Sequence, residues 1–232
     1  MSAYHAGKPQ VLLFDVNETL LDLTPLKNQI DDLLLLENGS VLWFSTMLHH
    51  SLVLSASGQY KSFTDVGAAC LQMVARNQDI ALEEAEAARI VGSLRSMPVH
   101  TDVVAALEQL KQAGFQMAAL SNSGQTGLEA QLKNAGIDGF FAKALSVEHV
   151  GKFKPHHEVY QWAAREMDVG IERCMLVAAH GWDVAGAKWA GMRTAFVERP
   201  GQHLFPLAPL PDIHVAQLSE LYNELGSASA SV

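Results

Sequence analysis

Short apolar runs alternate with amphipathic stretches along the chain, and this pattern predicts its secondary structure. Apolar runs at 11–15, 115–120, 140–145, 175–179 and 194–197 predict buried strands. Helical periodicity predicts helices at 103–113, 128–135, 158–167 and 184–190, and a glycine follows three of these helices. Repeated strand–helix units are typical of a doubly wound α/β fold, in which helices cover both faces of a parallel sheet.

A long helical stretch interrupts this alternation directly after the first strand. Apolar residues recur at helical spacing from 21 to 97, and we predict helices beginning near 21, at 63–77 and at 82–94. A further helix is expected to start with Ser40 as its N-cap and to run through Trp43 and Leu52. We therefore predict an α/β core domain formed by 1–20 and 98–232, with a helical domain, 21–97, inserted into it.

Composition narrows the class of protein. The 232 residues are 49% hydrophobic and 18% charged, as in an ordinary globular protein, and the net charge is −9. This charge argues against nucleic acid or an anionic membrane as the main partner. Cys70 and Cys174 lie far apart and form no CxxC, so we expect reduced thiols. Residues 1–9 have no apolar signal core and no run could span a membrane, so a soluble cytoplasmic protein is expected.

Polar residues follow the predicted strands at the points where each strand ends. Asp15 ends the first strand, Ser121 and Asn122 follow the second, Lys154 precedes a helix, and Asp183 follows a later strand. In an open parallel sheet these ends share one edge, where ligands bind. Each residue also has a structural explanation, as a helix cap, a turn former or a solvated lysine. Their joint occurrence at strand ends favours a shared site.

Four motifs in this order carry a resemblance to a known family. They are Phe14-Asp15-x-x-x-Thr19-Leu20, Leu120-Ser121-Asn122, Lys154-Pro155 and Trp182-Asp183. The chain resembles the haloacid dehalogenase superfamily over nearly its whole length, which implies a Rossmann-like core with an inserted helical cap. Within it the chain is similar to the (S)-2-haloacid dehalogenases, which share Ser-Asn in the second motif, Trp-Asp in the fourth, and a Tyr, here Tyr160, six residues after the Lys.

The resemblance implies a catalytic role for four residues. Asp15 is the implied nucleophile, attacking the α-carbon of the substrate in an SN2 displacement that forms an aspartyl ester. Lys154 keeps Asp15 ionised, because a close opposite charge lowers a carboxyl pKa. Thr19 hydrogen-bonds around the nucleophile. Asp183, together with Lys154, positions or activates the water that cleaves the ester, and the substrate carbon is inverted.

The resemblance also implies a set of substrate-binding residues and no cofactor. Ser121 and Asn122 are expected to bind the substrate carboxylate, and the remaining candidates around it are Phe44, Tyr160, His180, Asn17 and Trp182. A phosphatase of this superfamily has a second Asp as general acid and base where Asn17 stands, and an Asn cannot fill that role. Magnesium prefers carboxylate oxygens, so we expect no metal.

Two departures from the dehalogenase pattern concern the leaving group. Aligning Leu42-Trp43 with the cap of the dehalogenases puts Phe44 where they have a halide-binding Arg, and Arg95 is too near the end of the cap to replace it. His180 stands where the dehalogenases commonly have Asn. An apolar Phe44 gives little help to a departing halide but suits a neutral amine.

Two leaving groups therefore remain open, a halide or the ring nitrogen of L-azetidine-2-carboxylate, whose opening gives 4-amino-2-hydroxybutyrate. A magnesium-dependent phosphatase and a catalytically inactive binding protein are further alternatives. His49, His50 and His180 are further candidates to line the pocket, beside a structural role for each. The expected partners are a small carboxylic acid substrate and, from the resemblance, a second copy of the chain in a homodimer.

Overall fold

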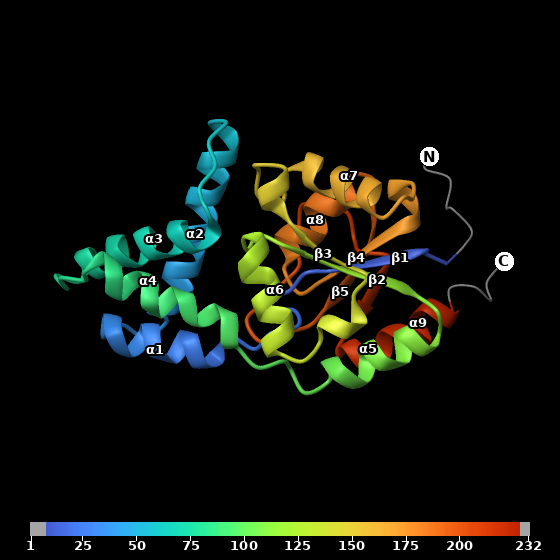
Figure 1. Ribbon diagram of the computed structural model, residues 1–232, viewed down its shortest axis with the longest axis horizontal. Helices are drawn as coiled ribbons and strands as arrows, with labels where there is room; N and C mark the ends of the chain where they lie inside the picture. Colours follow the sequence, from blue (N-terminus) through green and yellow to red (C-terminus); the bar gives the residue numbers. More distant parts are fainter. Residues whose placement is uncertain (1–7, 228–232) are drawn as a thin grey trace.

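A six-stranded parallel sheet forms the centre of the computed structural model, which describes residues 8–227 (Figure 1). The strands are β1 Val11–Phe14, β2 Gln116–Ser121, β3 Lys143–Ser146, β4 Cys174–Ala178, β5 Arg193–Val197 and β6 Ile213–Val215, in the order β3-β2-β1-β4-β5-β6. Every neighbouring pair is parallel. The predicted α/β fold is confirmed. Strand β6 was missed, because three residues are too few to show a periodic pattern.

Helices cover both faces of this sheet (Figure 1). On one face lie α5 Val103–Gln112, α6 Gln125–Asn134 and α9 Leu221–Ser227, and on the other α7 His157–Glu166 and α8 Gly181–Trp189. Short 3₁₀ turns, η2 Asp138–Phe140, η3 Val147–His149, η4 Ile171–Arg173 and η5 Leu218–Glu220, join these elements. With both faces covered, all four residues of β1 are buried, which explains its unbroken apolar sequence.

Two helices of the core begin earlier than the sequence predicted. Helix α6 starts at Gln125 rather than 128, and α8 starts at Gly181 rather than 184. The first turn of α6 carries polar or small residues, and that of α8 has Trp182 between a glycine and an aspartate, so neither shows the start of an apolar stripe. As a consequence Asp183 lies inside the first turn of α8, and the alternative that it caps this helix is wrong.

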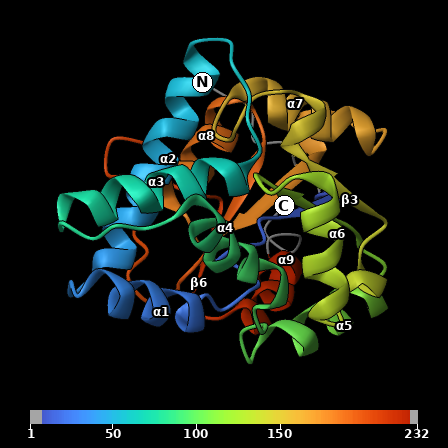
Figure 2. The same cartoon turned by 60° about the vertical axis from the view of Figure 1, so that its left-hand side comes forward.

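The stretch between the first two strands forms a separate group of helices, here called the helical block. It consists of α1 Thr24–Leu34, α2 Gly39–Ala56, α3 Phe63–Asn77 and α4 Glu84–Gly92, followed by η1 Ser93–Ser96. Within residues 22–98 the structure has helices and turns but no strand. Figures 1 and 2 show the block beside the end of the sheet toward which β1 runs.

Helix α2 corrects one predicted boundary. It begins at Gly39, two residues before the position that a Ser40 N-cap requires, because Asn38 takes a left-handed conformation, with φ of 60°, and is itself the N-cap. The backbone N–H of Ser40 instead donates to the Asp31 carboxylate over 2.6 Å, which ties α2 to α1.

The contacts between the helical block and the core include those of its two linkers and of the Phe153 side chain. The linkers run side by side, since Asp22 N–H donates to the Pro98 carbonyl over 2.7 Å. The buried ring of Phe153 stacks on Tyr60 at a centroid distance of 5.2 Å and lies 5.8 Å from Phe63, both in or next to α3. This contact holds the block against the segment that carries Lys154.

Two expectations from composition concern the whole chain. None of the helices within residues 8–227 is long and apolar enough to cross a membrane. Cys70 and Cys174 are free and buried, and burial raises their thiol pKa values to about 11 and about 12, respectively.

Candidate active site

Asp15 follows β1 directly and lies at the carboxyl edge of the sheet, where the connections from β1 and β4 diverge. Its side chain is almost fully buried. Lys154 Nζ donates to Asp15 Oδ1 over 2.8 Å, and Thr19 Oγ1 donates to Oδ2 over 2.7 Å. The Thr19 hydroxyl in turn accepts the backbone N–H of Ala179 over 2.9 Å, so β1 and the end of β4 are joined through it. Both oxygens of the carboxylate are therefore held in place.

Lys154 joins Asp15 to a second carboxylate. Its Nζ lies 2.6 Å from Asp183 Oδ2 and donates to the Leu120 carbonyl over 3.0 Å, with only 2% of the residue exposed. Tyr160 donates from its hydroxyl to the other oxygen of Asp183 over 2.6 Å. The side chains from the ends of β1 and β4 thus meet at one buried ammonium, as the spacing of the motifs predicted.

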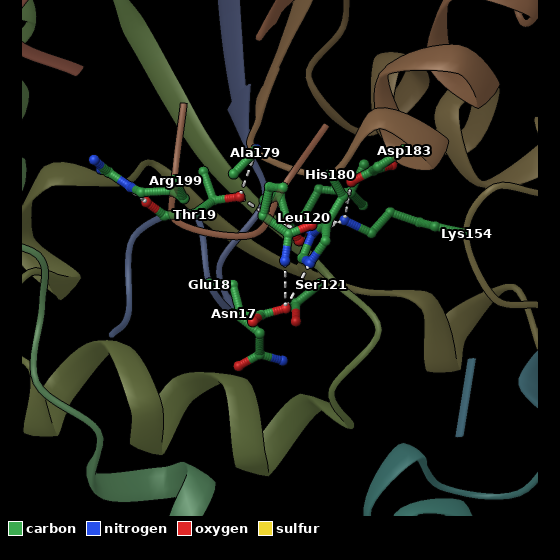
Figure 3. A network of polar contacts seen from close by, with 12 residues as sticks. Asn17, Glu18, Thr19, Leu120, Ser121, Lys154, Ala179, His180, Asp183 and Arg199 are labelled. Carbon is green, nitrogen blue, oxygen red and sulfur yellow. Dashed lines mark hydrogen bonds and ion pairs between the residues drawn. The ribbon is translucent and has the colours of Figure 1, made fainter. Parts of the chain in front are cut away.

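His180 also contacts Asp15. Its Nδ1 lies 3.0 Å from Asp15 Oδ2, and its Nε2 lies 2.9 Å from Glu18 Oε2. Glu18 also pairs with Lys27, which comes from α1 of the helical block. Figure 3 shows the contacts that join Glu18, His180, Lys154 and Asp183 as dashed lines. The result is a row of alternating charges that runs from Asp183 through Lys154, Asp15, His180 and Glu18 to Lys27.

These contacts shift the pKa values of Asp15, His180 and Asp183. Burial raises the pKa of Asp15, but the Lys154 charge and the hydrogen bond from His180 outweigh it and hold this pKa well below its usual range. Burial lowers the pKa of His180, whereas the hydrogen bonds to Asp15 and Glu18 raise it to about 9. The pKa of Asp183 is raised, mainly by burial and by the Asp15 charge, against the effect of Lys154. Asp15 is therefore ionised and His180 charged at neutral pH, while Asp183 is the stronger base of the two carboxylates.

Aromatic rings from two elements enclose His180. Phe44 of α2 stacks on the imidazole at a centroid distance of 5.9 Å and an interplanar angle of 14°. Trp182, in the first turn of α8, lies 5.1 Å from the same ring. Arg95 is exposed, and its carbonyl accepts a hydrogen bond from Asn134. The helical block thus presents Phe44 to the ring that contacts Asp15.

The turn after β2 supplies the other predicted side chains. Ser121 Oγ accepts the backbone N–H of Ser123 over 3.1 Å, and Asn122 Oδ1 accepts the backbone N–H of Lys154 over 2.9 Å. Asn17 donates to Ser123 Oγ over 3.3 Å and accepts from Gln131 over 2.8 Å. Its side chain therefore connects the turn after β1 to α6.

The remaining candidates have simpler surroundings. His49 and His50 lie edge to face on α2, with ring centroids 5.2 Å apart. Among residues 8–227 there is no group of three or more His, Cys, Asp or Glu side chains arranged to hold a metal ion.

Sequence reasoning missed three charged residues that support the site. Glu18 stands inside the first motif, one residue before Thr19, and only this adjacency could have drawn attention to it. Lys27 looked like an ordinary surface lysine of an amphipathic helix. Arg199 donates to the Thr19 carbonyl and forms a bidentate pair with Asp102, with both contacts at 2.9 Å. Glu18 and Arg199 contact residues far away in the chain, and no motif or spacing in the sequence indicates these contacts.

Comparison with known proteins agrees with this architecture. The family model described as haloacid dehalogenase-like hydrolase matches residues 9–191, so the chain belongs to this family of hydrolases. It is 28% identical over 222 residues to (S)-2-haloacid dehalogenase 2 of Pseudomonas sp. (strain CBS-3), covering 94% of this chain and 96% of that protein. The chain is thus a hydrolase of the haloacid dehalogenase type.

Solved structures of haloacid dehalogenases share the fold of this chain. A crystal structure of an L-2-haloacid dehalogenase superposes with a TM-score of 0.88 at 26% identity, covering 95% of this chain and all of that one. The L-2-haloacid dehalogenase from Xanthobacter autotrophicus with chloropropionic acid covalently bound has a TM-score of 0.85 at 22% identity, covering 92% and 97%. At this identity the second likeness concerns the fold alone.

Proposed function

We propose that the chain is an (S)-2-haloacid dehalogenase-like hydrolase that acts on small 2-substituted carboxylic acids through an ester of Asp15, without a metal. The observation that carries the proposal is the buried Asp15 carboxylate, held ionised by Lys154 at 2.8 Å. An ionised carboxylate fixed at the end of a strand is suited to attack on carbon. The printed names of the curated relatives support the substrate class.

In the first step Asp15 Oδ1 forms a bond to the α-carbon while the bond from that carbon to the leaving group breaks. Ser121 and Asn122, at the adjacent strand end, bind the substrate carboxylate in this proposal, and the helical block acts as the cap over it. Attack from the side opposite to the leaving group inverts the carbon. The leaving group departs with the electron pair of the broken bond.

In the second step water attacks Cγ of the Asp15 ester and returns the enzyme. Asp183 accepts the proton of the water, since its raised pKa makes it the better base. The bond between Cγ and the ester oxygen then breaks, and this oxygen takes the proton from Asp183 as it leaves with the hydroxy acid, so this oxygen of the product comes from Asp15. Negative charge develops on Oδ2, where the Thr19 hydroxyl and His180 Nδ1 lie 2.7 and 3.0 Å away and act as donors.

The environment of Phe44 favours a second leaving group, the ring nitrogen of L-azetidine-2-carboxylate. This nitrogen enters as an ammonium and leaves as a neutral amine, so it needs no cation beside it. An aromatic ring attracts a bound ammonium through its π-face. Phe44 stacks on His180, 5.9 Å between centroids, and His180 contacts Asp15. The product of this reaction is 4-amino-2-hydroxybutyrate.

Single turnover in ¹⁸O-water tests the covalent mechanism. The enzyme in excess is mixed with 2-chloropropionate, azetidine-2-carboxylate or a phosphate ester, and the oxygen of the product is analysed by mass spectrometry. We expect unlabelled product in the first turnover and labelled product after many turnovers. Asp15→Asn should abolish turnover, while Asp32→Asn, an exposed aspartate of α1, should retain it.

Two results contradict the proposal. Labelled product in the first turnover shows that water, not Asp15, attacks the substrate. Phosphate release that EDTA abolishes, without reaction at either 2-substituted acid, identifies a phosphatase instead.

A further inference from the structure

Glu18 occupies a position that the proposed reaction does not explain. It is only 5% exposed, and its φ of 62° lies in the left-handed region, which is unfavourable for a residue with a Cβ. Strained backbone of this kind persists only where surrounding contacts fix it, and it concentrates at functional sites. The contacts here are to His180 Nε2 at 2.9 Å, to Gln202 Nε2 at 3.3 Å and to Lys27. A buried carboxylate on strained backbone, one residue from Thr19, indicates a functional role for Glu18.

The hydrogen-bond partners of the two ring nitrogens of His180 determine its protonation state. Both ring nitrogens lie within hydrogen-bond distance of carboxylate oxygens, Nδ1 of Asp15 and Nε2 of Glu18. Ionised carboxylates only accept hydrogen bonds, so both nitrogens must donate, and the ring is an imidazolium. Without the Glu18 charge, Nε2 has no acceptor with a negative charge and the ring can stay neutral. Glu18 therefore controls whether the group on Asp15 Oδ2 carries a positive charge.

The groups that face this ring come from four elements. Asp15 follows β1, Glu18 lies in the turn after it, Phe44 comes from α2 and Trp182 from α8. Behind the two carboxylates lie Lys154, Lys27, Gln202 and His100, the last through a 3.1 Å contact between its Nε2 and the Glu18 carbonyl. Two carboxylates contact the ring directly, and no other described ionisable group does so.

We propose that Glu18, braced by Lys27 of the helical block, is a positioning residue that keeps His180 charged against Asp15 Oδ2 and so serves hydrolysis of the ester rather than its formation. This inference rests on the proposed function. In hydrolysis, charge grows on Oδ2, and a cationic donor there stabilises the oxyanion. In the alkylation step the carboxylate loses its charge, so the same donor stabilises the reactant and does not accelerate the attack.

Because the positive charge on His180 assists hydrolysis of the ester but not its formation, Glu18→Gln should slow hydrolysis selectively. The substitution keeps the shape of the side chain and removes its charge, so His180 loses its proton at a lower pH. We expect the ester to form but to be hydrolysed at least about tenfold more slowly at neutral pH, since a charge-assisted donor is replaced by a neutral one. The unreleased ester then accumulates on the chain during turnover.

Intact-protein mass spectrometry during turnover of 2-chloropropionate or azetidine-2-carboxylate measures this accumulation, and a pH–rate profile accompanies it. The rate of wild-type hydrolysis should fall as pH rises through the titration of His180, and Glu18→Gln should move this fall to lower pH. Lys27→Met, which alters a partly exposed residue, should move it in the same direction by less. Glu86→Gln, at an exposed glutamate of α4, should match wild type.

Titration of the His180 ring nitrogens by ¹⁵N NMR needs no substrate. We expect the Glu18→Gln and Lys27→Met variants to lose the imidazolium signal at lower pH than wild type. Unchanged titration, or a wild-type ring that is already neutral at pH 7, overturns the proposal, as does a Glu18→Gln enzyme that slows without accumulating ester. If the wild-type enzyme forms no ester, the proposed reaction is wrong. The NMR titration still decides whether Glu18 controls the protonation of His180.

Discussion

At Asp15 one buried carboxylate is shared between two cations. Lys154 contacts Oδ1, and His180 contacts Oδ2 together with the Thr19 hydroxyl. Each cation has a further carboxylate behind it, Asp183 or Glu18, so no charge in the row is left without a partner. Burying ions is costly unless each is paired. The pairing explains how a group of charges survives at the end of a fully buried strand.

Protonation of His180 links stability to pH. Its pKa is raised to about 9 from 6.5, so its stabilising effect is complete below about pH 6.5 and is lost as pH rises through about 9. At about 1.4 kcal/mol per pKa unit, this effect is at most about 3–4 kcal/mol. We expect the stability gap between wild type and His180→Asn to shrink from about pH 6 to about pH 10 in thermal unfolding.

His214→Asn is the matched control, since this exposed histidine pairs with Glu198 at the surface. Its stability difference from wild type should change little over the same range, because exposed ion pairs contribute little. A gap that is constant with pH at His180 contradicts an imidazolium at that position.

Phe44→Arg tests the choice of leaving group. The substitution places a cation where the structure has an aromatic ring against His180. Because a preorganised donor stabilises a departing anion, we expect the ratio of 2-chloropropionate to azetidine-2-carboxylate turnover to rise by about tenfold or more. Leu52→Arg, at an exposed position of the same helix, should leave the ratio unchanged. An unchanged ratio in Phe44→Arg means that the leaving group departs elsewhere.

At the scale of elements, the site depends on close packing between α7 and α8. Tyr160 of α7 reaches Asp183 in the first turn of α8, and the segment at Pro155 passes against Gly186. A Cβ on Gly186 would clash with Pro155 and lie 2.9 Å from the Tyr160 hydroxyl. The absence of a side chain at Gly186 therefore lets the two helices approach until Tyr160 contacts Asp183.

Gly186→Ala should disturb this contact. We expect a loss of about 1–3 kcal/mol in the free energy of unfolding, as for overpacked cores, and a fall in activity as Tyr160 moves from Asp183. Urea unfolding and steady-state kinetics measure the two effects. Gly127→Ala is the control, because it lies inside α6 with no atom within 4 Å of the added carbon. Helix propensity predicts that Gly127→Ala stabilises by up to about 1 kcal/mol, and equal effects at both sites contradict the packing explanation.

At the scale of the whole molecule, the helical block and the core meet next to Lys154. Phe153 precedes Lys154 and is buried between Tyr60 and Phe63, while its N–H donates to Ser55 Oγ over 2.9 Å. The position of the block is thereby linked to the segment that delivers Lys154 to Asp15.

Phe153→Ala should loosen this junction. Removing a fully buried phenylalanine costs about 3–5 kcal/mol, so we expect a clear fall in the urea midpoint and in activity. Phe205→Ala, at a phenylalanine that is 45% exposed, should cost much less. Normal stability and normal turnover in Phe153→Ala would contradict the link between the helical block and the segment that carries Lys154.

The sequence alone was sufficient for five of the six strands, for the helical character of residues 22–98 and for the four motifs. Hydrophobic periodicity reports burial, and burial on two faces follows directly from a continuous apolar run such as residues 11–14. Helix starts were less accurate at α6 and α8, because their first turns carry too few apolar residues to show a periodic pattern. The strand β6 was missed because its length carries no periodicity.

Tertiary structure alone decided which charges face Asp15. The contact of Asp15 with Lys154 spans 139 positions of the chain, and that of Glu18 with His180 spans 162, so local pattern could not specify either geometry. The motifs indicated that Asp15 and Lys154 belong together, but nothing local marked Glu18 or Lys27. Residue types and their order along the chain determine the fold and point to Asp15 as the candidate nucleophile, whereas folding brings distant charges into contact and sets the protonation of the site.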